Sequence, residues 1–296
     1  MNGVLIIDKP SGLTSHDVVN RARRILGERS IGHLGTLDPM ATGILPLVVG
    51  SYTRLAQFYL NSEKKYEGTV RFGFSTDTYD AEGEATSEAK EVALHREAAE
   101  TLAAKFRGVI EQHPPPFSAK KIKGVPAYKL ARKHNEVVLK PVQVEIKELE
   151  IVSVEGDRLR FRARVGSGTY MRSVAHDMGR DMGCGAHLES LRRTAVAEFT
   201  LDEAVALDDL ARQAGNCPID SGADLFFHPR KLLPHFPSVA ADEQTAARIR
   251  DGRPVNLPEL SRARQVKVFS GQRNLIAIAT RVAGSLFHAK IVLSAS

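Results

Sequence analysis

The alternation of hydrophobic and polar residues predicts a chain that mixes strands with amphipathic helices. Residues 3–8 form a near-continuous apolar run, which is typical of a buried strand. Thr14 or Ser15 then caps a predicted helix, because apolar residues recur after them at helical spacing. These apolar positions are Val18, Ala22, Ile25 and Leu26. Residues 44–49 form a second apolar run, which suits a buried strand or the start of a helix.

Two further segments alternate with the period of a strand. In residues 65–74, Tyr66 falls on the apolar face, where it is either a core residue or a side chain that stacks on a substrate. In residues 158–165, every second residue is an arginine and the residues between them are apolar. Four guanidinium groups on one strand face favour a solvated surface, with a binding surface as the alternative.

Two helices are predicted in the middle of the chain. Residues 91–106 carry apolar side chains at steps of four, and Gly108 ends this amphipathic helix. A second helix follows residues 166–169, with Tyr170 and Arg172 at its N-terminus, where the helix dipole favours anions. Its buried side is formed by Met171, Val174, Ala175, Met178 and Met182.

The pattern changes at about residue 234 to brief strands joined by tight turns. A short helix is predicted over residues 242–250, and the turns contain Gly271 and Gly284. The strands are predicted over residues 266–269, 275–280 and 287–293. The sequence therefore predicts a larger domain, residues 1–233, followed by a compact β module, residues 234–296.

Composition narrows the class of protein. The chain has 296 residues, of which 43% are hydrophobic, enough for a globular core. The net charge of +6 is compatible with a polyanionic partner. Two cysteines, Cys184 and Cys217, predict a reduced, cytoplasmic protein without a zinc site, and the apolar run near the N-terminus is too short for a signal peptide or membrane span. No phosphate-loop or dinucleotide-binding pattern occurs, so no nucleotide cofactor is expected.

The segment over residues 32–47 places a single acid, Asp38, among three glycines and two prolines. This composition suits an irregular loop that approaches a ligand closely. Pro39 biases Asp38 toward an extended backbone. A carboxylate on a stiff loop is suited to covalent catalysis, whereas the alternative is an ordinary Asp-Pro turn.

Two other polar segments are candidates for a binding role. Residues 76–83 form a turn-rich loop in which Asp80 is either a supporting acid or part of solvated turn chemistry. Residues 113–140 contain three consecutive prolines and several lysines and arginines among few large apolar residues. Such a segment is either a solvated hairpin or a phosphate-binding insertion.

The segment over residues 32–47 closely resembles the catalytic motif of the bacterial tRNA pseudouridine-55 synthases, the TruB-type family. Further blocks follow in the family's order and extend the resemblance over about residues 3–235. Leu34 stands where the family commonly has Thr, and Gly68 where it commonly has Ala. The blocks are residues 8–15 (DKPSGLTS), 65–68 (KYEG), 76–83 (TDTYDAEG), 114–121 (PPPFSAKK), 168–172 (GTYMR) and 191–193 (LRR).

The resemblance implies an α+β fold. Its catalytic domain would have a mixed, largely antiparallel sheet with flanking helices, over residues 1–233, and an RNA-binding insertion at about 113–140. Residues 234–296 would form a small β-rich, PUA-like RNA-binding domain.

The resemblance also implies the activity: isomerisation of uridine 55 in the T-arm of tRNA to pseudouridine, by base flipping and an aspartate nucleophile. Asp38 would be the nucleophile, attacking either the ribose anomeric carbon or the base, and Arg172 would keep it ionised. Tyr66 would stack on the flipped base and take part in proton movement. Other expected substrate contacts are His33, Tyr170 and Leu191; expected supporting residues are Lys9 and Asp80; expected phosphate contacts are Lys120, Lys121 and Lys123.

The expected enzyme needs no metal or cofactor and acts as a cytoplasmic monomer on tRNA, with no membrane and no obligatory protein partner. Two alternatives remain. One is a non-catalytic RNA-binding or tRNA-folding protein, which would be indifferent to Asp38. The other is an enzyme on the same scaffold that modifies a different uridine with the help of a guide RNA.

Overall fold

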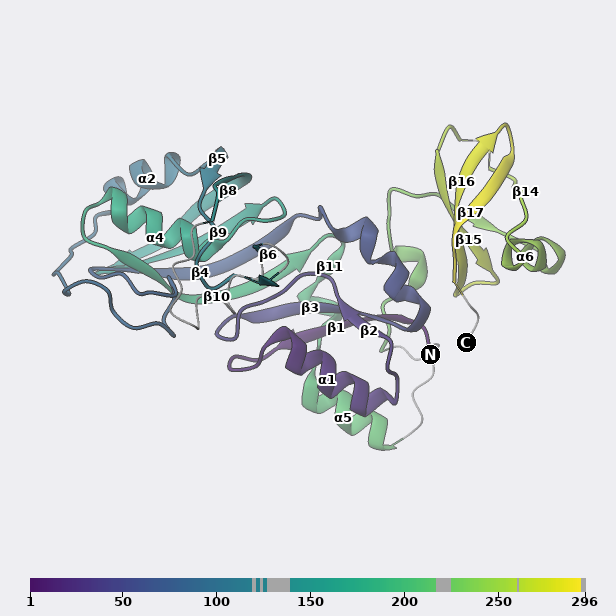
Figure 1. Ribbon diagram of the computed structural model, residues 1–296, viewed down its shortest axis with the longest axis horizontal. Coiled ribbons are helices and arrows are strands. Elements are labelled where there is room, and N and C mark those ends of the chain that lie inside the picture. Colours follow the sequence, from purple (N-terminus) through teal and green to yellow (C-terminus); the bar gives the residue numbers. More distant parts are fainter. Residues whose placement is uncertain (119–120, 123–124, 127–138, 217–224, 260, 294–296) are drawn as a thin grey trace. The chain divides into compact units, whose positions relative to one another are not determined.

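The computed structural model describes residues 1–118, 121–122, 125–126, 139–216, 225–259 and 261–293 (Figure 1). The chain divides into two compact units, and each is described by itself. Unit 1 comprises Met1–Leu37, Ile44–Leu60 and Glu198–Ser296, and unit 2 comprises Asp38–Gly43 and Asn61–Ala197. Within the described ranges, no helix has the length and apolar character that a membrane-spanning segment needs.

Unit 2 is built on antiparallel strands in the order β10-β4-β9-β8-β5. The first residues of β3 (Thr42–Val49) also belong to this unit, where they pair in parallel with β10. The predicted strands over residues 65–74 and 158–165 are confirmed as β4 and β9. The bounds are β10 (Ala186–Val196), β4 (Lys64–Phe72), β9 (Arg158–Val165), β8 (Val142–Glu155) and β5 (Gly108–Gln112).

Two helices cover this sheet. α4 (Met171–Asp181) packs against β10 and β4, and α2 (Arg96–Ala104) packs against β8 and contacts α4 (Figure 1). The helix predicted over residues 91–106 is therefore too long at its start. The backbone N–H of Leu94 donates to the carbonyl of Gly156 at 3.1 Å and its side chain is buried, so a tertiary contact takes the place of the first helical turn.

Unit 1 contains the predicted N-terminal strand and helix, β1 (Gly3–Lys9) and α1 (Ser15–Leu26). Thr14 caps α1 as predicted: its hydroxyl accepts from the N–H of Asp17, whose carboxylate accepts from the N–H of Thr14. α5 (Leu207–Asn216) packs against α1. The other elements are β2 (Ile31–His33), the rest of β3, the 3₁₀ helices η1 (Gly50–Tyr59), η2 (Leu201–Glu203) and η3 (Pro229–Lys231), β11 (Phe199–Thr200) and β12 (Val205–Ala206).

The C-terminal β module is present as predicted, with a five-stranded sheet in the order β13-β15-β16-β17-β14. It has its own core, in which Ile249, Val268, Ile276 and Phe287 are fully buried. The domain boundary between residues 233 and 234 stays a prediction. The bounds are β13 (Ser238–Ala240), α6 (Glu243–Arg250), β14 (Val255–Asn256), β15 (Gln265–Ser270), β16 (Asn274–Ala283) and β17 (Leu286–Val292).

Candidate active site

Asp38 and Arg172, which are 134 positions apart in the sequence, meet within unit 2. The guanidinium Nε lies 2.9 Å from Asp38 Oδ2, and Nη2 donates to Asp38 Oδ1 at 2.9 Å. Nη2 thus supplies a charge-assisted hydrogen bond, and Nε adds a close ion-pair contact that lacks hydrogen-bond geometry. The Arg172 side chain is 5% exposed, whereas the Asp38 side chain is 30% exposed. The arrangement buries the cation and leaves the carboxylate accessible to a substrate.

Three further acceptors surround the Arg172 guanidinium. Nη1 donates to the carbonyl of Thr78 at 3.0 Å and lies 3.4 Å from Asp80 Oδ2, and Nη2 also donates to the carbonyl of Phe117 at 2.9 Å. Asp80 is buried, and its Oδ1 accepts from the Thr78 hydroxyl at 2.6 Å. With two carboxylates facing one guanidinium, the cluster is anionic, and Asp38 is its exposed member.

The turn after Asp38 holds the carboxylate on a short, constrained segment. The N–H of Ala41 donates to the Asp38 carbonyl at 3.1 Å, and Pro39 lies inside this turn. Gly43 then passes close to β10 with φ +96°, and a Cβ there would lie 2.2 Å from the carbonyl oxygen of Arg193. Only glycine fits this close approach, which explains why the loop ends with this residue.

The first turn of α4, which carries Arg172, is fixed by the end of β5. The Gln112 side chain accepts from the N–H of Tyr170 at 2.8 Å and donates to its carbonyl at 3.1 Å. The Ser173 hydroxyl donates to the carbonyl of His113 at 2.7 Å. Gln112 is 1% exposed, so these hydrogen bonds are shielded from water. Gln112 was not predicted as a site residue from the sequence. The available signal was its position as a polar residue at the end of a strand, close to three prolines.

Tyr66 and Leu191 share one face of the sheet. Tyr66 pairs with Arg193, and Gly68 pairs with Leu191, so the two side chains are diagonal neighbours on β4 and β10. Each of the two residues is 8% exposed. The structure brings together two residues that the resemblance implies as substrate contacts, and their roles stay predictions.

The structure explains why Gly68 stands where the family commonly has Ala. A Cβ at this position would lie 2.6 Å from the carbonyl oxygen of Ser190 and 2.7 Å from Phe161 Cζ. The Phe161 ring of β9 therefore occupies the space that an alanine methyl group would need.

The Tyr170 phenol belongs to the same unit as Asp38 and Arg172. Burial raises the pKa of Tyr170, while the nearby Ser118 hydroxyl and the charge of Arg172 oppose that rise. The phenol is therefore neutral near pH 7 and can donate a hydrogen bond.

Lys9 and His33 belong to unit 1. Lys9 is fully buried, and its Nζ donates to the carbonyls of Pro10 at 2.8 Å and Leu13 at 2.6 Å, which holds the turn between β1 and α1. His33 ends β2, opposite Leu47 of β3. The proposed supporting and substrate-binding roles of these two residues stay predictions.

The predicted phosphate contacts fall largely where the structure gives no description. Lys120 and Lys123 lie outside the described residues, as does most of the insertion over residues 113–140. Lys121 begins the two-residue strand β6 (Lys121–Ile122), which pairs with β7 (Val125–Pro126); only its backbone is described.

The arginine face of β9 is a network of surface ion pairs. Arg158 contacts Glu189 at 2.9 Å, and Arg162 contacts Glu67 at 3.0 Å. Arg164 contacts Glu148 at 2.6 Å. These pairs favour the interpretation of a solvated face over that of an RNA-binding surface.

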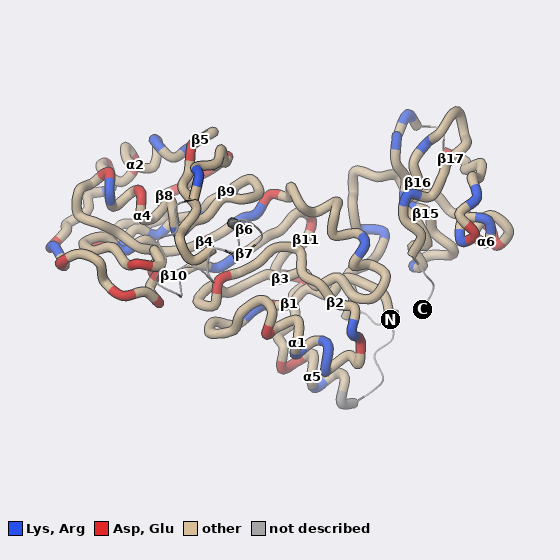
Figure 2. The backbone as a smooth tube through the Cα atoms, viewed as in Figure 1, with Lys and Arg blue, Asp and Glu red and all other residues tan. Residues whose placement is uncertain are grey.

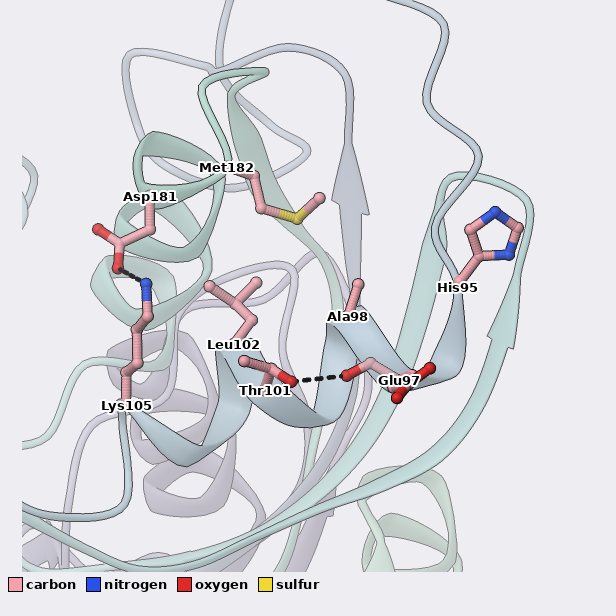
Figure 3. A pocket seen from close by; sticks show the side chains of 8 residues that line it. All are labelled: His95, Glu97, Ala98, Thr101, Leu102, Lys105, Asp181 and Met182. Carbon is pink, nitrogen blue, oxygen red and sulfur yellow. Dashed lines mark hydrogen bonds and ion pairs between the residues drawn. The ribbon is translucent and has the colours of Figure 1, made fainter.

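A separate hollow of about 640 Å³ lies between α2 and the C-terminal end of α4 (Figure 3). Leu102 and Met182 contribute apolar surface, and Lys105 pairs with Asp181 at 3.5 Å. Arg172 is at the opposite end of α4, roughly 15 Å along an 11-residue helix. The hollow is therefore distinct from the Asp38 cluster. Across the described part of the chain, no group of three or more His, Cys, Asp or Glu residues could hold a metal ion.

The fold is shared with solved structures of other proteins. A similar solved structure is described as "Crystal Structure of a Cbf5-Nop10-Gar1 Complex", with 24% identity, a TM-score of 0.72, and coverage of 99% of this chain and 85% of that chain. A structure of an "H/ACA RNP bound to a substrate RNA containing 2'-deoxyuridine" has 23% identity and a TM-score of 0.70, with the same coverage. At these identities the likeness establishes the fold alone.

The chain belongs to the TruB family of pseudouridylate synthases. The model of the TruB family pseudouridylate synthase N-terminal domain matches residues 23–171, and the model of the tRNA pseudouridylate synthase B C-terminal domain matches residues 172–220. The tRNA pseudouridine synthase B of Solibacter usitatus (strain Ellin6076) is 51% identical over 99% of this chain and 100% of the relative. The tRNA pseudouridine synthase B of Azoarcus sp. (strain BH72) is 41% identical over 93% and 90%, respectively.

Proposed function

We propose that this chain is a tRNA pseudouridine synthase that isomerises uridine 55 in the T-arm. The two-point Asp38–Arg172 pair, with its buried guanidinium and accessible carboxylate, is the observation that carries the proposal. Family membership and the names of the relatives support it.

The reaction detaches uracil from the ribose, rotates it, and rejoins it through carbon 5. The glycosidic N1–C1′ bond is exchanged for a C5–C1′ bond, carbon 5 loses a proton and N1 gains one, so atoms balance without an oxidant or water. Asp38 is the nucleophile in this proposal, and both the anomeric carbon and carbon 6 of the base remain open as its target. Arg172 favours the ionised form of Asp38 through the ion pair at 2.9 Å.

The target uridine must leave its stacked position to reach Asp38, which costs a few kcal/mol. Tyr66 and Leu191 would enclose the flipped base, and their position as diagonal neighbours on one sheet face supports this proposal. The Tyr66 ring would stack on the base and its hydroxyl would assist proton movement. Tyr170 would hold the nucleotide, and His33 would fill the space that the base vacates.

The distribution of charge supports a polyanionic substrate. Residues 234–296 contain nine lysines and arginines and four acidic residues, so this module carries +5 of the chain's net +6 (Figure 2). Phosphate contacts dominate the affinity of most nucleic-acid-binding proteins. We therefore propose that the C-terminal module and Lys120, Lys121 and Lys123 contact the tRNA phosphates. The proposed enzyme is a cytoplasmic monomer that acts without a protein partner.

The test is to map pseudouridine in an unmodified tRNA transcript after incubation with the purified protein. The proposal predicts a new signal at position 55 of the T-arm without an added guide RNA. A signal at another uridine would overturn the substrate assignment, and no signal with a folded, tRNA-binding protein would support a non-catalytic binding protein.

A further inference from the structure

Tyr79 has a strained backbone in the loop that holds Arg172. Its φ is +65°, and it is one of three non-glycine residues in the described ranges with a positive φ. L-residues with bulky side chains rarely adopt this conformation, and such strain concentrates at functional sites. Tyr79 lies between Thr78 and Asp80, and both of these neighbours contact the Arg172 guanidinium.

The Tyr79 ring stacks on His176, which lies one helical turn after Arg172 on α4. The ring centroids are 3.8 Å apart and the planes differ by 14°. Burial raises the pKa of Tyr79, and burial followed by the charge of Arg180 lowers the pKa of His176. Both rings are therefore neutral near pH 7, and the contact is a stack between neutral rings.

The backbone of the same loop is tied to a different element. The N–H of Leu188 on β10 donates to the Tyr79 carbonyl at 3.0 Å, and the N–H of Ala81 donates to the Leu188 carbonyl at 3.1 Å. The backbone thus fixes the loop to the sheet, while the Tyr79 ring fixes it to α4. Arg172 is on α4, so the ring sets the spacing between the guanidinium and its acceptors in the loop.

We propose that Tyr79 is a positioning residue: its stack on His176 holds the Thr78 carbonyl and the Asp80 carboxylate against Arg172, which in turn aligns Asp38. The inference deepens the proposed function, because it rests on Arg172 aligning the nucleophile. A purely structural Tyr79 would add stability without affecting the rate of the chemical step.

The test variant is Tyr79→Gly, which removes the side chain, because glycine adopts a positive φ without strain. Tyr79→Phe keeps the ring. His176→Ala removes the other half of the stack. Ala197→Gly is the matched control, since Ala197 also has a positive φ, of 49°, in the turn after β10.

Single-turnover pseudouridine formation in an unmodified tRNA transcript should slow by at least about tenfold in Tyr79→Gly, since small misplacements of catalytic groups cost one to two orders of magnitude. The dissociation constant for tRNA should stay within about threefold, because phosphate contacts set it. Tyr79→Phe should restore most of the rate. The double variant Tyr79→Gly/His176→Ala should be no slower than Tyr79→Gly, because both substitutions remove the same ring stack. Ala197→Gly should match the parent.

A second readout does not depend on turnover: the hydrogen-exchange rate of the Arg172 Nη protons, which donate to Thr78 and Asp38, measured by NMR. It should rise in Tyr79→Gly and remain low in Tyr79→Phe. Parental exchange in Tyr79→Gly would overturn the proposal, as would a rate loss that only follows lost tRNA affinity or lost folding. A parent protein that makes no pseudouridine would contradict the proposed function, while the exchange measurement would still decide the role of Tyr79.

Discussion

Arg172 and the arginines of β9 pair with carboxylates in opposite surroundings. The side chains of Arg158, Arg162 and Arg164 are 34–57% exposed, and their partners are also at the surface. Arg172 is 5% exposed and has two carboxylates and two backbone carbonyls around it. Surface pairs contribute about 0–1 kcal/mol, whereas removing one partner of a buried pair typically costs several times more. Burial thus distinguishes Arg172 from the arginines of β9.

Among Arg172 and the arginines of β9, the largest effect is expected at Arg172. Arg172→Lys keeps a positive charge but cannot form the two-point contact with Asp38, so single-turnover pseudouridine formation should fall by about 100-fold or more. Arg172→Met should also lower the free energy of unfolding by roughly 3–5 kcal/mol, because Asp80 stays buried without its cation. Urea titration measures this second quantity. If a folded Arg172→Lys protein formed pseudouridine within threefold of the parental rate, the two-point contact with Asp38 would not be needed for the reaction.

The next effect concerns packing on the Tyr66 side of the sheet. Gly68→Ala places a methyl group against the Ser190 carbonyl and the Phe161 ring, so we expect a loss of roughly 1–3 kcal/mol in unfolding free energy. Phe161→Leu in the same chain should recover part of this loss, because it removes the ring atoms in contact. Urea denaturation of Gly68→Ala, Phe161→Leu and the double variant gives the coupling free energy between positions 68 and 161. Additive effects would mean that Phe161 does not fill the alanine site.

A smaller effect is expected on the charged face. Arg162→Gln removes a surface pair with Glu67 and should change stability by no more than about 1 kcal/mol, with the pseudouridine rate unchanged. Glu67→Gln is the matched control for the other partner. If Arg162→Gln alone weakened tRNA binding and made its salt dependence shallower, the β9 arginines would belong to the RNA interface.

A further effect, on the charged residues beside β10, is a pH dependence at Lys64. Burial, assisted by the charge of Arg193, lowers the pKa of Lys64 to about 8 from 10.5. The folded state therefore binds fewer protons than the unfolded state between these values, so this residue makes stability rise with pH through that window; below pH 8 its full cost is present. The melting temperature of the parent minus that of Lys64→Met should increase from pH 8 to 10. A constant difference would mean that Lys64 does not titrate in this window.

Local sequence patterns predicted the elements that depend on local contacts. The cap at Thr14, the alternation of β9 and the glycine turns of the C-terminal module were readable because each signal lies within a few residues. β8 was missed, because register shifts after Ile146 and Ile151 interrupt its alternation. The helix that was predicted to begin at residue 91 begins at Arg96, for a similar reason. The Leu94–Gly156 hydrogen bond is a long-range contact, which local spacing does not reveal.

Some residues of the candidate site could likewise be predicted from the sequence, and others could not. The resemblance pointed to Asp38 and Arg172, and the structure places them in contact. The acceptors from Thr78 and Phe117 are backbone carbonyls, which every residue type carries, so no residue pattern could reveal them. The positive φ of Tyr79 was equally hidden, because bulky residues are not the usual choice for that conformation.

Asp38→Asn tests most directly whether the Asp38 carboxylate is the nucleophile of the reaction. The substitution keeps the size of the side chain and removes its negative charge, which leaves a poor nucleophile. We expect a folded variant that binds tRNA within roughly an order of magnitude of the parent, because phosphate contacts dominate affinity, and that forms no detectable pseudouridine. A melting curve and a binding titration at the assay's salt concentration are the controls. A folded, tRNA-binding Asp38→Asn protein that made pseudouridine at a rate comparable to the parent would contradict the account.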